Sequence, residues 1–80
     1  MQNNSKHIFT DITSEEYREY LFPAPHGRFV KVRINKPTHL SVSESGGHRL
    51  LDEDGVSHYV PSGWVHLSWK AKQGQPNFVA

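Results

Sequence analysis

The fold of this chain is decided by one alternating stretch near its centre, Phe29-Val30-Lys31-Val32-Arg33-Ile34. Val30, Val32 and Ile34 occupy every second position, and basic residues stand between them. Successive side chains of a strand point to opposite faces, so a period of two predicts a strand with one apolar face. The other face of this strand is expected to be basic and to carry Phe29.

Turn-forming residues punctuate the chain on both sides of this stretch, roughly every eight to twelve residues. They lie at Pro23–Gly27, Asn35–Pro37, Ser45–Gly47, Asp52–Gly55 and Pro61–Gly63. Between them, the residue pattern predicts strands over 39–43, 48–51, 56–60 and 64–69. The sequence therefore predicts an all-β fold, a small antiparallel meander of roughly five to six strands curled into a barrel-like or SH3-like sheet.

Residues 13–22 are compatible with two structures. Thr13 and Glu16 have the spacing of a capping box, which predicts a short helix over 14–20. The aromatic residues of the same segment instead favour a strand that pairs with the alternating stretch. A helix would have to end at Pro23 after about two turns, which is marginal in water. We therefore favour the hairpin, with a short helical turn at its entry.

A chain of 80 residues is long enough for one domain and not for two. We expect a disordered arm over 1–7, a single β domain over 8–72, and a tail over 73–80 that docks through Phe78. No apolar run approaches the length needed to span a bilayer, and no leader-like apolar segment follows the N-terminus. We therefore expect neither a membrane partner nor a signal peptide. The absence of cysteine favours a reducing compartment, the cytoplasm.

The sequence contains no pattern that is typical of catalysis. None of its serines lies in a Gly-x-Ser-x-Gly elbow, and no glycine-rich phosphate loop opens a helix. Neighbouring carboxylates occur only at Glu15–Glu16 and in the 52–54 turn, where solvent is expected to surround them. We therefore predict a protein that is not an enzyme and that uses no cofactor.

Three histidines fall on successive predicted strands, His48, His58 and His66. If Val60 pairs with Trp64 across a three-residue loop, His58 lies opposite His66 on one face and could begin a zinc or copper site. A shift of one residue in the register would place the two imidazoles on opposite faces. The simpler interpretation is that all three are ordinary strand histidines, so a histidine metal site is the third hypothesis.

A basic and aromatic strand face gives the second hypothesis, a nucleic-acid-binding small β-barrel. Phe29, Lys31 and Arg33 share one face, and Trp64 and His66 would extend it if they point outward. Aromatic rings stack on bases, and cations follow a phosphate backbone. The net charge of only +1 argues against strong, salt-sensitive binding of nucleic acid.

The first hypothesis is a non-catalytic module that binds a protein partner. Tyrosine, tryptophan and arginine dominate the energetics of protein interfaces, and Trp64, Tyr59, Arg33 and Phe29 are the candidates here. The open edges of a small sheet also accept a partner strand or a second copy of the chain, so a homodimer is a further expectation.

The stretch from His48 to Trp64, HRLLDEDGVSHYVPSGW, resembles small uncharacterised proteins carried by bacterial phages and prophages. The resemblance covers less than half of the chain and includes no known functional motif. It implies a small accessory or inhibitor protein that acts by occupying a surface of a host protein.

Overall fold

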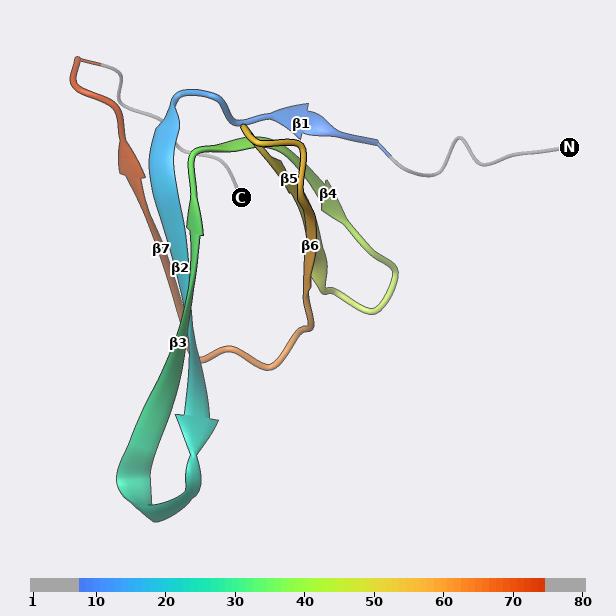
Figure 1. The fold of residues 1–80 in the computed structure, drawn as a ribbon. Coiled ribbons are helices and arrows are strands. Elements are labelled where there is room, and N and C mark those ends of the chain that lie inside the picture. Colours follow the sequence, from blue (N-terminus) through green and yellow to red (C-terminus); the bar gives the residue numbers. More distant parts are fainter. Residues whose placement is uncertain (1–7, 75–80) are drawn as a thin grey trace, which may run out of the picture.

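The computed structural model describes residues 8–74, which are almost entirely β (Figure 1). The predicted arm over 1–7 and the predicted docking of Phe78 lie outside the described residues. The described part contains seven strands and one short 3₁₀ turn, η1. In chain order these are β1 (Thr10–Asp11), β2 (Glu15–Ala24), η1 (Pro25–Gly27), β3 (Arg28–Asn35), β4 (Pro37–Val42), β5 (His48–Asp52), β6 (Ser57–Val60) and β7 (His66–Ala71).

The strands form two antiparallel sheets. One has the order β1-β4-β5-β6 and the other the order β3-β2-β7. The chain changes sheet at Lys36, the single residue between β3 and β4, and again in the loop between β6 and β7. The all-β prediction and the β4–β5–β6 meander are confirmed, and the sheets face each other in a barrel-like way without closing (Figure 1).

The last strand differs from the prediction in both start and partner. It begins at His66 rather than at Trp64, and it pairs with β2 instead of with β6. The backbone N–H of Val65 donates to the carbonyl of Leu21 at 2.8 Å, so the chain has already crossed to the second sheet there. The predicted pairing of Val60 with Trp64 is therefore wrong.

Residues 15–22 belong to β2 and pair with β3, so the favoured hairpin is confirmed, and neither the alternative helix over 14–20 nor a helical turn at the entry forms. The backbone N–H of Thr13 donates to Asp11 Oδ1 at 2.8 Å, and its hydroxyl donates to the same oxygen at 2.6 Å. These bonds belong to a tight turn between β1 and β2 and leave no helix to cap. From Tyr17 to Leu21, β2 is paired on both edges, with β3 on one side and β7 on the other, which satisfies the backbone groups of this segment.

The core lies between the two sheets. Six apolar side chains are at most 4 % exposed there, namely Ile12, Tyr20, Ile34, Leu40, Leu50 and Val60. Phe22, Val32, Trp64 and Leu67 pack around them. This core is small, as expected for a domain of this length. No helix of the described residues is long and apolar enough to cross a membrane.

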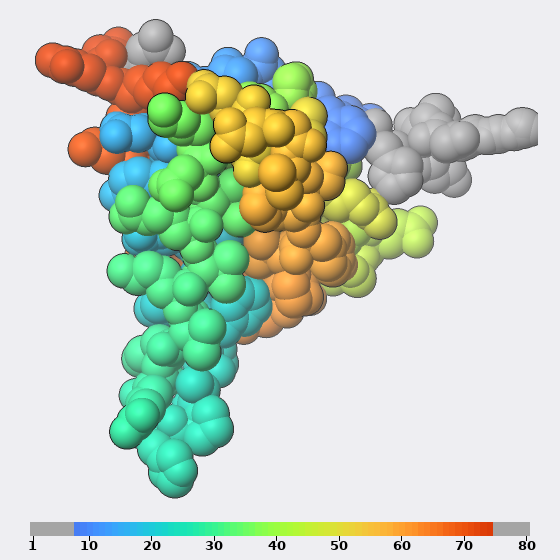
Figure 2. Space-filling view, in the orientation of Figure 1, coloured from blue at the N-terminus to red at the C-terminus, as the bar shows by residue number. Residues whose placement is uncertain are grey.

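The β2–β3 hairpin is longer than the body and projects beyond it (Figures 1 and 2). At its tip, His26 and Gly27 have left-handed φ values of 63° and 70°, and the N–H of Arg28 donates to the carbonyl of Pro25. Two consecutive left-handed residues are the requirement of a type I′ hairpin turn, which matches the twist of the flanking strands. The tip is therefore a tight, ordered turn.

Lys36 is expected to be a strained residue, because its φ of 51° is left-handed and it is not glycine. Its N–H donates to the carbonyl of Glu16 and its carbonyl accepts from the N–H of Glu53, which fixes this conformation. Lys36→Gly should raise the free energy of unfolding by about 0.5–1 kcal/mol in urea unfolding.

Lys70→Gly is the matched control, since Lys70 is equally exposed, lies the same 3.9 Å from a glutamate, and sits in a regular strand. It should be destabilising. If both variants lost the same amount of stability, strain at Lys36 would be contradicted.

Candidate functional site

The outer face of the β3–β2–β7 sheet, the side turned away from the other sheet, brings four of the predicted binding residues together. Lys31 lies opposite Leu21, which lies opposite His66 on β7. Arg33 and Phe29 occupy the neighbouring rows on β3, opposite Glu19 and Pro23. The register thus places Phe29, Lys31, Arg33 and His66 on one surface.

Charges on this outer face are partly balanced. Arg33 Nε donates to Glu19 Oε2 at 2.7 Å, and Lys31 Nζ lies 3.9 Å from the other oxygen of the same carboxylate. The guanidinium of Arg33 also stacks on Tyr17, 3.9 Å from its ring centroid. One carboxylate therefore interacts with both cations.

Tyr59 lies on a different surface, the outer face of the β1-β4-β5-β6 sheet. Its hydroxyl is 3.0 Å from Ser45 Oγ and 3.4 Å from Ser43 Oγ. These hydrogen bonds lower the pKa of the Tyr59 phenol, and the bond to Ser43 has the largest effect. Gly47 lies directly beneath the ring, where a Cβ would come within 2.7 Å of Tyr59 Cζ. Tyr59 is therefore held in place over Gly47, away from the other candidates.

A pocket of about 300 Å³ opens on the same sheet as Tyr59. Its walls are mostly apolar, and the residues that line it are Phe9, Arg49, Leu50, Leu51, Ser57, His58 and Tyr59. A volume of this size lies at the lower end of the range of small-molecule pockets. This pocket could not be predicted from the sequence, because Phe9 and β5 are far apart along the chain.

Trp64 packs against the core instead of extending the basic face. Its ring centroid lies 4.7 Å from His48, 5.0 Å from Tyr20 and 6.4 Å from Phe22. It precedes β7 and is half-buried, so the expectation that it points outward with His66 is corrected. The predicted contact residues thus fall into three separate places.

The three candidate histidines have different surroundings. His58 Nε2 is 2.8 Å from Asp52 Oδ2, and this hydrogen bond is the main cause that lowers the pKa of Asp52. His48 is buried against Tyr20, whereas His66 lies on the outer face of the other sheet. His58 and His66 do not face each other, and residues 8–74 contain no cluster of three side chains suited to hold a metal.

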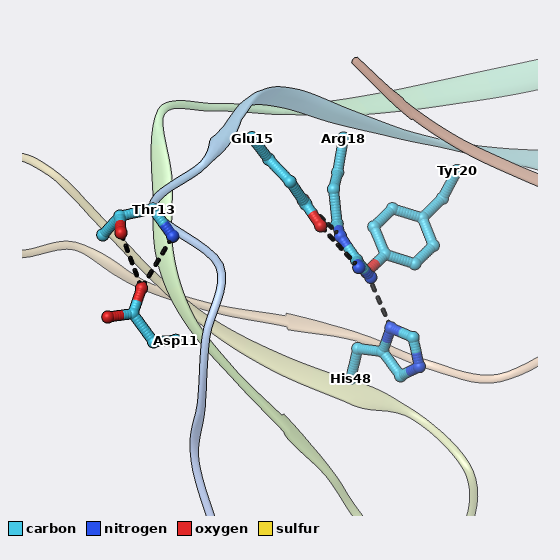
Figure 3. A network of polar contacts seen from close by, with 6 residues as sticks. All are labelled: Asp11, Thr13, Glu15, Arg18, Tyr20 and His48. Carbon is cyan, nitrogen blue, oxygen red and sulfur yellow. Dashed lines mark hydrogen bonds and ion pairs between the residues drawn. The ribbon is translucent and has the colours of Figure 1, made fainter. Parts of the chain in front are cut away.

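Four polar side chains form a buried network that sequence reasoning missed, Glu15, Arg18, Tyr20 and His48 (Figure 3). Arg18 Nε and Nη2 donate to the two oxygens of Glu15 at 2.7 and 2.9 Å. Arg18 Nη1 lies 3.4 Å from the hydroxyl of Tyr20, which is 2.7 Å from His48 Nδ1. Because Tyr20 accepts from Arg18, its own proton is left to donate to His48.

A β-bulge explains why the sequence hides this network. Residues 15 and 18 of a regular strand point to opposite faces. The pairing with β7 shifts between Glu15 and Tyr17, and this irregularity turns Glu15 inward beside Arg18. Burial lowers the pKa of His48 to about 4, with a further contribution from the positive charge of Arg18. The imidazole is therefore neutral at pH 7.

No family model, curated protein or solved structure matches this chain. Residue roles therefore follow from the geometry of the chain itself. The network of Glu15, Arg18, Tyr20 and His48 is enclosed, so it suits stability more than contact with a ligand. The outer face of the β3–β2–β7 sheet and its projecting hairpin are the accessible alternative.

Proposed function

We propose that this chain is a non-catalytic protein-binding module, and that its contact surface is the outer face of the β3–β2–β7 sheet together with the hairpin tip. The observation that carries the proposal is the projecting hairpin, on which Phe29 is 57 % and Val30 is 53 % exposed. Large apolar side chains gathered on a protrusion gain most by burial against a partner.

The composition of the surface favours a protein over a nucleic acid. Lys31 and Arg33 are partly neutralised by the carboxylate of Glu19, so the excess of cations on this face is small. The arginine stacked on Tyr17 beside an exposed phenylalanine is typical of a protein interface. A binding surface for nucleic acid would carry a larger excess of cations.

The turn at the tip supports the same proposal. His26 and Gly27 hold the hairpin in a tight turn, so little backbone entropy is lost when a partner docks on it. The lack of cysteine fits a module that works in the cytoplasm. The resemblance of residues 48–64 to phage and prophage proteins fits an accessory or inhibitor role.

Phe29→Ala should weaken capture of the partner about thirtyfold, the loss that corresponds to roughly 2 kcal/mol at an interface hot spot. The immobilised protein is incubated with bacterial lysate, and a stoichiometric partner is identified and then titrated against both forms. Val42→Ala is the matched control, because Val42 is also 57 % exposed but lies on the other sheet. It should bind the partner like the wild type.

The proposal fails if no stoichiometric partner is captured and the protein is strictly monomeric, or if Phe29→Ala binds the partner as well as Val42→Ala does. The nucleic-acid hypothesis predicts a different result. A labelled single-stranded oligonucleotide would then bind at low salt, dissociate as salt is raised, and bind less well to Lys31→Ala.

A further inference from the structure

The β3 strand is an open edge of its sheet. The sheet order is β3-β2-β7, and among residues 8–74 no strand pairs with the second side of β3. With eight residues, β3 is longer than the other edge strands, β1, β6 and β7. An exposed edge offers unpaired N–H and C=O groups to another strand.

The register shows which backbone groups face this edge. The N–H of Lys36 donates to the carbonyl of Glu16, so the hydrogen-bonded positions of β3 recur at every second residue before it, at Ile34, Val32 and Val30. The N–H and C=O groups of Phe29, Lys31 and Arg33 consequently point away from β2, to the open side.

A second bond supports this assignment. Lys31 pairs with Leu21, and the carbonyl of Leu21 accepts from Val65 on the opposite side of β2. In the next pair, Phe29 faces Pro23, a residue with no N–H. Because Pro23 lies opposite Phe29, at a position that is not hydrogen-bonded to β3, it removes no hydrogen bond from the hairpin. Proline is tolerated in a strand at such positions.

The residues with open backbone groups are the same ones whose side chains form the outer face. A strand added here would bond to the backbone of Phe29, Lys31 and Arg33, and its side chains would lie directly opposite theirs. Two of the three are cations that share the single carboxylate of Glu19. On the other face of the strand, the half-exposed Val30 offers an apolar contact.

We propose that β3 accepts an extended segment of a partner protein as a fourth strand, with acidic side chains opposite Lys31 and Arg33 and an apolar one beside Phe29. This inference rests on the proposed function and names the chemistry of the partner. Main-chain bonds supply affinity in such strand addition, and alternate side chains supply specificity. Antiparallel pairing with a second copy of the chain is disfavoured in the register centred on Lys31, because it would set like charges opposite each other.

The probe is a labelled peptide of alternating valine and glutamate, Val-Glu-Val-Glu-Val-Glu-Val, with a valine and lysine peptide of the same length as its control. Fluorescence anisotropy should show the acidic peptide binding about tenfold tighter or more than the basic one. Lys31→Glu should reverse this preference. Equal binding of the two peptides, or no binding of the acidic one, would overturn the proposal.

Lys31→Pro tests strand addition itself. The N–H of Lys31 faces the open edge, so proline removes a donor for the incoming strand without removing a bond to β2. The variant should lose about tenfold or more in peptide affinity while its circular dichroism stays that of the wild type. Because Lys31→Glu retains the backbone donor, it keeps the charge test available if the proline variant does not fold.

Amide hydrogen exchange gives an independent readout in the wild-type protein. On peptide binding, the amides of Phe29, Lys31 and Arg33 should gain protection, whereas those of Val30 and Val32 should already be protected in the free protein. Unchanged exchange at the first three amides in the bound state would overturn strand addition.

The captured partner separates this inference from the proposed function. If Phe29→Ala no longer captures the partner and Lys31→Pro still does, the proposed binding surface is supported and strand addition is contradicted. If neither variant affects capture, both proposals fall. Loss of the partner in both variants supports both.

Discussion

Replacing Arg18 by leucine is expected to lower the free energy of unfolding by about 3–5 kcal/mol. The total stability of a domain is often only about 5–15 kcal/mol, and a small domain lies near the lower end. A loss of that size would leave little of the folded state at room temperature. Urea unfolding followed by circular dichroism measures it, and a strongly lowered transition midpoint is the expected result.

The physical reason is the carboxylate that the substitution leaves behind. Glu15 and Arg18 are both completely buried, and the guanidinium donates to both oxygens of the carboxylate. Without Arg18, Glu15 must stay charged without its partner or take up a proton, and Tyr20 loses a donor. The ring of Trp69, 5.0 Å from the guanidinium, loses a cation as well.

The double variant Glu15→Leu/Arg18→Leu is the control. It removes both charges, so most of the loss seen in Arg18→Leu should be recovered. Arg33→Leu provides a second comparison, because it breaks an ion pair at a half-exposed site and should cost less than about 1 kcal/mol. If the double variant is no more stable than Arg18→Leu, the loss comes from packing and not from an unpaired charge.

The strands that could be predicted from the sequence are those whose pattern is local. The alternation over 29–34 placed β3, and the glycine turns around residues 46 and 55 placed β5 and β6, because both signals lie within a few neighbouring residues. The partner of β7 could not be predicted. Val65 bonds to Leu21, more than forty residues earlier, and no local pattern encodes this contact.

The candidate site shows the same difference between features that a local pattern encodes and features that depend on distant residues. Phe29, Lys31 and Arg33 share a face because of the strand period alone, which the sequence displays. The buried ion pair was hidden, because Glu15 and Arg18 share a face only through the bulge in β2. A bulge depends on the strand that pairs beside it, so composition gives no sign of it. Charged residues in a predicted strand are usually solvated, which made the pair look ordinary.

Acid is expected to destabilise the protein between about pH 6.5 and pH 4 through His48. Its pKa is about 4 in the folded protein, against 6.5 for an ordinary histidine. As the pH falls below 6.5, the unfolded chain takes up a proton at this residue and the folded protein does not. The unfolded state is therefore stabilised relative to the native one, and the free energy of unfolding falls. The difference in pKa corresponds to a loss of about 3 kcal/mol in the free energy of unfolding once the pH has reached 4.

The cause of this pH dependence is the position of His48 within the network. The imidazole is only 5 % exposed, and it lies beside a tyrosine hydroxyl that already accepts from Arg18 and so donates its proton to Nδ1. A protonated ring could not accept that bond, and it would place a second positive charge near Arg18. Asp11 and Asp52 also have lowered pKa values. Their contributions to stability are lost at still lower pH, below the pH range in which His48 acts.

His48→Asn tests the assignment, because the amide oxygen of asparagine can accept from Tyr20 in place of Nδ1 but takes up no proton. Stability measured by urea unfolding should then change much less between pH 7 and pH 4 than in the wild type, whatever the absolute stability of the variant. His66→Asn, which removes an exposed histidine of β7, should leave the wild-type pH profile intact. A wild-type profile in His48→Asn would mean that another group takes up the proton, and that the buried imidazole does not control acid stability.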